Sequence, residues 1–222
     1  MATYTKAKIF NMALKNLGVS VGVQGATQTD RNTVVLNEYY DTAKEKTLTD
    51  HDWGFASTYR EVTPTDNAIS LNPRFLYKYD YPNDCVFIRE VYQHFKEEYL
   101  NKQFLQNGGV VPKGYKIENP EKAEFEPASD TQGRRIFYTS VSPAIIRYTR
   151  IVEEEAYYTP EFAMALSWYL AFLAASSVTG ARVKMSDCLQ VYTQMLREAT
   201  TKDANEGYKE DTEECDWIEA RN

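Results

Sequence analysis

Apolar positions in the first fifty residues recur at the three- and four-residue spacing of amphipathic helices. Thr5 is a candidate N-cap for a first helix, and Gly18 supplies the signal that ends it. A second helix is expected to begin after Thr29 or Asp30 and to end near His51. The apolar positions that define the two helices are Ile9, Phe10, Ala13, Leu14 and Leu17, then Val35, Leu36, Tyr39, Tyr40 and Ala43.

From Trp53 to about Val152 the pattern changes to the two-residue alternation that is typical of strands. Aromatic side chains occupy alternate positions over 75–81, which predicts a strand with one aromatic face. Further runs rich in β-branched and aromatic residues lie at 86–92, 135–139 and 146–152, with turn signals at 107–109 and 130–133. We therefore predict a small antiparallel β domain with long loops.

Helical spacing returns at Thr159, a candidate N-cap, with Pro160 in the first helical position, where its missing N–H costs nothing. This helix is apolar or small on both sides, so we expect it to be covered on nearly all sides. One side carries Phe162, Leu166, Tyr169, Leu170 and Leu173, and the other carries Met164, Trp168, Ala171 and Ala175. Gly180 separates it from a last helix over 185–199, which runs into an acidic tail.

Helices, then strands, then helices is the order expected of an α+β fold. Each terminal pair of helices has an apolar face too large to leave exposed, so the two pairs are predicted to form one helical bundle around an inserted antiparallel β domain. The predicted division is a helical domain of 1–52 and 153–205, a β domain of 53–152, and an acidic carboxyl-terminal tail of 206–222.

Composition excludes several classes of function. Three widely spaced cysteines, Cys85, Cys188 and Cys215, do not form a secreted disulfide framework or a metal motif, which favours a reducing cytoplasm. The amino-terminal pattern lacks the apolar core of a signal peptide. A net charge of -7 without a basic cluster argues against tight nucleic-acid binding. Seventeen tyrosines fit a tyrosine-rich core and a protein interface equally well.

No catalytic residue, metal ligand or cofactor site is predicted. The segment 18–22 matches the GxSxG pattern, but a predicted helix precedes Ser20, and only His51 and His94 could act as its base. His51 between two aspartates fits the end of a helix better than a metal site. The glutamate runs at 153–155 and 210–214 are interpreted as solvated charge.

The uncharged stretch 162–178 is shorter than the roughly twenty residues that span a bilayer, and it contains three serines. A membrane span is therefore not predicted. The remaining interpretations are a fully internal helix or one shared with a neighbouring subunit, and we favour the shared one. Its alanines permit close approach in either case.

Four passages of the chain, taken in order, resemble one family. They are AKIFNMALKNLGVSV at 7–21, Trp53-Gly54-Phe55-Ala56, Tyr79-Asp80-Tyr81-Pro82-Asn83-Asp84-Cys85, and Tyr148-Thr149-Arg150 followed by Thr159-Pro160-Glu161-Phe162-Ala163 and Tyr169-Leu170-Ala171. Their order and spacing resemble the tail tubular protein A family, the head-to-tail adaptor ring proteins of short-tailed bacteriophages, including crAss-like phages. Tyr81 stands where the family usually has leucine, and neither 95–130 nor the acidic tail is closely similar.

The resemblance implies a structural virion protein at the head-to-tail junction, assembled in the cytoplasm of the bacterial host. Such a subunit would form a homo-oligomeric ring, expected to be twelvefold, that connects the portal protein to further tail or ring proteins. Genomic DNA would pass through the ring without specific binding, and the acidic balance predicts an acidic channel wall because such a wall does not hold phosphates. No enzyme activity, cofactor or membrane is implied.

Candidate ring-interface residues come from the aromatic strand and from the doubly apolar helix. They are Phe75, Tyr77 and Tyr79, and Met164, Trp168 and Ala171. Two alternatives remain open: a hydrolase that uses Ser20, which predicts that Ser20→Ala abolishes an activity, and a monomeric binding module, which light scattering with and without portal would separate from a ring.

The acidic tail carries three large side chains, Tyr208, Trp217 and Ile218, that are typical anchors for binding a partner. We expect them to dock on the portal or on an adjacent subunit. Truncation after Gly207 should therefore weaken portal binding, measured by co-sedimentation, while circular dichroism of the subunit stays unchanged. Full portal binding by the truncated chain would contradict this role for the tail.

Overall fold

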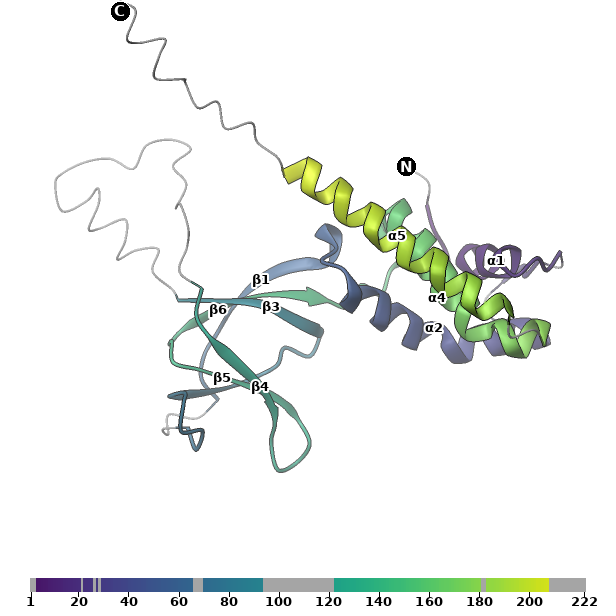
Figure 1. The fold of residues 1–222 in the computed structure, drawn as a ribbon. Coiled ribbons are helices and arrows are strands. Elements are labelled where there is room, and N and C mark those ends of the chain that lie inside the picture. Colours follow the sequence, from purple (N-terminus) through teal and green to yellow (C-terminus); the bar gives the residue numbers. More distant parts are fainter. Residues whose placement is uncertain are drawn as a thin grey trace, which may run out of the picture. The chain divides into compact units, whose positions relative to one another are not determined.

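The computed structural model describes residues 3–20, 22–25, 27, 29–65, 70–93, 122–180 and 183–207. The fold is α+β, as predicted (Figure 1). The chain divides into a helical unit, Met1–Thr47 with Tyr158–Asn222, and a β unit, Leu48–Tyr157. These boundaries lie about five residues from the predicted ones, because the contacts group 48–52 and 153–157 with the β unit.

The amino-terminal helices of the helical unit begin at the predicted caps. Helix α1 spans Lys6–Asn16, and Thr5 Oγ1 accepts a hydrogen bond from the Lys8 N–H (3.2 Å). Gly18 follows its end with a φ of 74°. Helix α2 spans Arg31–Asp50, and Asp30 rather than Thr29 caps it, because its carboxylate accepts from the Thr33 N–H (3.2 Å) and hydroxyl (2.6 Å).

Helices α4, Pro160–Thr179, and α5, Val183–Gly207, form an antiparallel pair in the helical unit (Figure 1). The Glu161 and Lys202 side chains form an ion pair at 2.6 Å, and the Tyr169 and Tyr192 rings pack with centroids 4.8 Å apart. Thr159 caps α4, and Gly180 ends it in the left-handed conformation, φ 68°. The predicted N-cap at Thr159 and the predicted end of the helix at Gly180 are both confirmed.

Small residues on α4 let neighbouring helices approach closely, and large residues fill the remaining space. Alanines at 163, 165, 171, 174 and 175 have no exposed surface. Asn16 at the end of α1 donates a hydrogen bond to the Ser167 hydroxyl (3.2 Å), so α1 lies against α4. The large side chains buried with them are Ile9, Phe10, Leu14, Leu36, Tyr40, Phe162, Leu166 and Leu170.

The β unit contains two three-stranded antiparallel sheets, in the orders β1-β6-β3 and β2-β5-β4. A short 3-10 turn, Gly54–Ala56, leads into the first strand. The strands are β1 Ser57–Val62, β2 Tyr77–Asp80, β3 Cys85–Gln93, β4 Phe125–Ser129, β5 Arg135–Thr139 and β6 Ala144–Arg150. The runs predicted at 86–92, 135–139 and 146–152 are confirmed as β3, β5 and β6, whereas β1 and β4 were not predicted.

An aromatic stack fills the core of the β unit. Tyr79 and Phe137 stack with centroids 5.0 Å apart and an interplanar angle of 13°, and the Tyr79 hydroxyl donates to the Val141 carbonyl (2.6 Å). Tyr81 meets the edge of Phe137, and burial raises the pKa of the neighbouring Cys85 thiol to about 12. Cys85 is therefore a neutral packing residue at physiological pH.

Gly180→Ala should destabilise the helical unit by about 1 kcal/mol, because a side chain at φ 68° strains the backbone even where there is space for it. The matched control is Gly25→Ala in the same unit, where φ is not positive and an added Cβ meets only the Thr27 hydroxyl at 4.0 Å. Urea unfolding followed by far-ultraviolet circular dichroism would compare the two. Equal losses of stability would contradict the strain argument.

Candidate interaction surfaces

Helix α4 leaves one line of large apolar side chains partly exposed. Met164, Trp168 and Phe172 lie at four-residue spacing and therefore on one side of the helix. Met164 is 41% exposed, and the other two are partly buried. We call these three residues the α4 stripe. An exposed apolar line on an otherwise buried helix is the kind of surface that binds a partner.

The interface prediction for α4 is wrong at Ala171. This residue has no exposed surface, because it packs inside the helical unit. Met164 and Trp168 stay candidates. By length and apolar composition α4 is also, among the described residues, the one helix that could cross a membrane, and half of that stretch is buried in the protein.

The interface prediction for the aromatic strand is wrong at Phe75 and Tyr79. Phe75 is 7% exposed, and Tyr79 is fully buried in the aromatic stack, so neither offers a surface to another chain. Tyr77 is partly buried against the same core. The exposed apolar side chain in this segment is Leu76, at 52%.

A second candidate surface is the outer face of the sheet β1-β6-β3. Tyr59 lies opposite Arg147, and Phe87 lies opposite Thr149 in the strand register, so these side chains share one face. Tyr59 is 64% exposed and Phe87 is 42% exposed. The Arg89 guanidinium lies over the Phe87 ring at 4.8 Å. We call Tyr59, Phe87 and Arg147 with their neighbours on this side the sheet face.

Arg89 joins the sheet face to the end of α2 within the β unit. Its guanidinium donates to the carbonyls of Leu48 (3.0 Å), Thr49 (3.0 Å) and His51 (2.7 Å). These groups belong to the carboxyl-terminal turn of α2 and the residue after it, where carbonyls lack partners inside the helix. The positive charge of Arg89 also lies at the negative end of the helix dipole, where it is stabilising. Arg89 thus holds residues 48–51 against strand β3 within the β unit.

Arg147 continues this polar network. It bonds to the carboxylates of Asp52 and, at 3.4 Å, Glu90, and Glu90 in turn accepts hydrogen bonds from Lys122 and the Tyr92 hydroxyl. Burial alone would raise the pKa of Glu90, but these donors and the nearby positive charges lower it overall. Burial and the bond to Glu90 raise the pKa of Tyr92 to about 12. Glu90 is therefore ionised at neutral pH.

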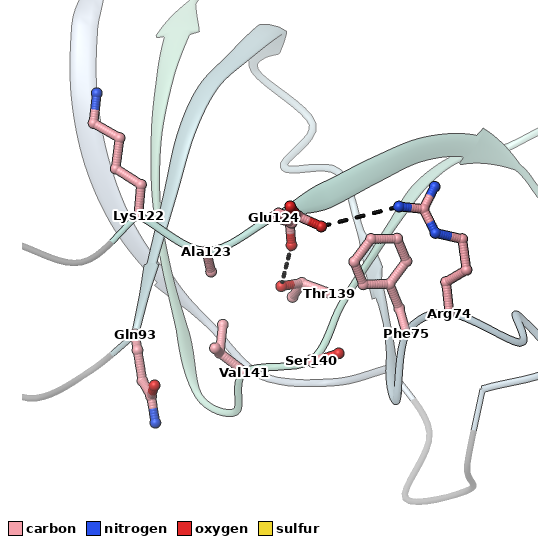
Figure 2. Close-up of a pocket in the computed structure, with 9 residues that line it drawn as sticks. All are labelled: Arg74, Phe75, Gln93, Lys122, Ala123, Glu124, Thr139, Ser140 and Val141. Carbon is pink, nitrogen blue, oxygen red and sulfur yellow. Dashed lines mark hydrogen bonds and ion pairs between the residues drawn. The ribbon is translucent and has the colours of Figure 1, made fainter.

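A shallow cleft of about 350 Å³ lies at the other sheet of the β unit (Figure 2). Phe75 and Val141 supply apolar lining, while Arg74 pairs with Glu124 and Glu126 at 4.0 Å. These ion pairs are largely exposed. An adjoining hollow of about 470 Å³ continues along the edge strand β4 to Pro127.

The hydrolase pattern does not form a nucleophile elbow. Ser20 follows the end of α1, whereas the elbow requires a strand before the serine. The His51 ring packs edge-on against Trp53, with centroids 4.6 Å apart. Across the described ranges, no cluster of His, Cys, Asp and Glu could hold a metal ion. His94, the run 210–214, Tyr208, Trp217 and Ile218 lie outside the described residues.

Sequence reasoning did not find the network on the sheet face. Asp52, Arg89, Glu90 and Arg147 come from three separate segments, and their meeting depends on strand register. The sequence did contain one signal for this network. The charged residues Arg89, Glu90 and Arg147 lie inside runs whose other residues are typical of a buried strand. A charge inside such a run indicates a paired charge.

Arg89→Lys should destabilise the β unit by about 1 to 3 kcal/mol, because an ammonium cannot reach three carbonyls and Thr149 in the geometry of a guanidinium. The control is Lys122→Ala in the same network, expected to change stability by less than about 1 kcal/mol because Lys122 is 64% exposed. Urea titration followed by tryptophan fluorescence checks both. An Arg89→Lys variant as stable as the unchanged chain would contradict this role of the Arg89 hydrogen bonds.

Comparison with models of known protein families and with curated protein sequences gave no match. The resemblance to the tail tubular protein A family therefore depends on the four passages alone. In the fold, Trp53 to Ala56 contains the 3-10 turn before β1, and Tyr79 to Cys85 joins β2 to β3. The geometry describes an α+β chain with two surfaces, the α4 stripe and the sheet face, that are candidates for binding a partner.

Proposed function

We propose that this chain is a subunit of a closed ring, twelvefold in number, that connects the portal to the tail of a short-tailed bacteriophage and extends the DNA channel. The observation that carries the proposal is the α4 stripe, a partly exposed apolar line on the most buried helix. The four passages similar to tail tubular protein A supply the identity of the ring.

A ring of identical subunits needs two different complementary faces on each copy. The α4 stripe in the helical unit and the sheet face in the β unit are two candidate faces that differ in chemistry. The first is apolar, and the second combines exposed Tyr59 and Phe87 with a paired arginine network. Aromatic residues and arginine are the types enriched at protein interfaces. This pairing of faces supports a head-to-tail contact between copies.

The charge balance agrees with a conduit for DNA. The chain carries a net charge of -7, so a channel built from it would repel phosphates and let DNA slide. Arg89 and Arg147 are both paired with Asp52, so their charge does not offer a site for phosphate. A ring whose channel is lined mainly by lysine and arginine would argue against this part of the proposal.

The α4 stripe also fits a monomeric binding module, which is the second candidate. The two functions differ in what the stripe contacts, another copy of this chain or a different protein. A hydrolase is not proposed, because Ser20 lacks the strand that an elbow requires.

Met164→Asp should reduce ring assembly on purified portal of the same phage by about tenfold or more, because the contact would then bury an unpaired carboxylate. Thr193→Asp on the exposed side of α5 is the control and should assemble normally. Electron microscopy and light scattering would count the rings. Normal rings from Met164→Asp would show that the stripe is not a ring contact, and a chain that binds portal as a monomer would favour the binding module.

A further inference from the structure

The loop from Ser70 to Leu76 in the β unit presents one apolar side chain entirely to solvent. Leu71 is 99% exposed, the highest value for a large hydrophobic residue in the described part of the chain. The Ser70 N–H donates to the Leu76 carbonyl (2.9 Å) and closes the loop. Inside it, the Asn72 N–H donates to the Ser70 hydroxyl (3.0 Å), and the Arg74 N–H donates to the Asn72 side-chain oxygen (2.9 Å). Leu71 therefore projects from a loop that is held by its own hydrogen bonds.

The same loop borders the hollow of about 470 Å³ along β4. The hollow is lined by Arg74 and Phe75 on the loop side and by residues 123–127 on the strand side. Ala123 and Phe125 supply apolar lining there, and both are only partly buried. A hollow with apolar walls accepts an aliphatic side chain. We call the loop and this hollow together the loop patch, and it contains both a projecting leucine and a space that fits one.

The loop patch also carries both signs of charge. The Arg74 guanidinium lies over the Phe75 ring, 5.5 Å from its centroid. Its nitrogens lie 4.0 Å from the carboxylates of Glu124 and Glu126, and Figure 2 shows the pair with Glu124. A separation of 4.0 Å is longer than a hydrogen bond, and all three side chains are exposed. Exchanging these weak pairs for equivalent ones in another molecule therefore costs little.

A patch with these properties is complementary to itself. In a twofold contact the same surface of both copies meets, so each projection must find a hollow, and each charge an opposite charge, within that one surface. The loop patch supplies Leu71 with the hollow, and Arg74 with two carboxylates. Symmetry then repeats every contact, so that two leucine side chains leave water at once. These features favour a second copy of this chain as the partner.

We propose that the loop patch binds a second copy of this chain about a twofold axis. Leu71 of each copy enters the hollow of the other, and Arg74 of each copy faces Glu124 and Glu126 of the other. The contact ends at two copies, because each copy uses its one loop patch. It includes no residue of the α4 stripe and none of the residues that define the sheet face. The contact therefore goes beyond the proposed ring and does not depend on it.

Leu71→Asp tests the projecting side chain without disturbing the fold, because Leu71 is almost entirely in solvent. Sedimentation equilibrium of the full chain without portal should show a dimer whose dissociation constant rises at least about tenfold in the variant. The matched control is Val34→Asp, an exposed apolar position on α2, which should leave the dissociation constant unchanged. An unchanged chain that stays monomeric up to about 1 mM would overturn the proposal, as would equal dissociation constants for the unchanged chain and Leu71→Asp.

Exchange of charge tests the pairing and its symmetry. Arg74→Glu makes the loop patch acidic, and Glu124→Arg with Glu126→Arg makes it basic, so neither variant should dimerise with itself. Circular dichroism should show both variants folded, since the three side chains are exposed. Mixed in equal amounts, the two variants should form a dimer, because arginine then faces glutamate on both sides of the twofold axis. A mixture of monomers would refute the pairing, and species larger than a dimer would replace the twofold contact with a head-to-tail one. Portal is absent throughout, so a failure of ring assembly leaves these results unaffected.

Discussion

The β unit depends on the hydrogen bonds that the guanidinium of Arg89 donates. One side chain satisfies three carbonyls at the end of α2, bonds to Thr149 on the central strand β6, and faces the Asp52 carboxylate. Each of these groups would be costly to leave without a partner in a partly buried site. Their shared donor therefore ties residues 48–51, at the end of α2 and just after it, to strands β3 and β6 within the β unit.

Local signals in the sequence were sufficient where a single residue decides the structure. Thr5, Asp30 and Thr159 each place a side-chain oxygen at a helix start, and Gly18 and Gly180 adopt the positive φ that ends a helix. The order of helices and strands then gave the α+β class. These features act over four residues or fewer, so the pattern of the chain contains them.

The sequence was insufficient where contacts between distant residues decide. Alternation over 75–81 identified a strand, but its face toward the aromatic core depends on Phe137, some sixty residues later. Tyr79 was therefore assigned to a surface although it is fully buried. Ala171 was misassigned for the same reason, since small size permits burial and exposure alike. The α4 stripe could be predicted as apolar, whereas its partial exposure required the packing of the helical unit.

Pro127 in the edge strand β4 limits how copies of this chain can meet. The backbone N–H of Asp130 donates to the Arg134 carbonyl. The alternation of hydrogen-bonded pairs along β4 then turns the backbone nitrogen of Pro127 toward the free edge, where proline has no N–H to donate. A second strand cannot add there in a regular ladder. Copies of the chain are thus prevented from pairing regularly through β4, so this edge does not lead to an open-ended fibre.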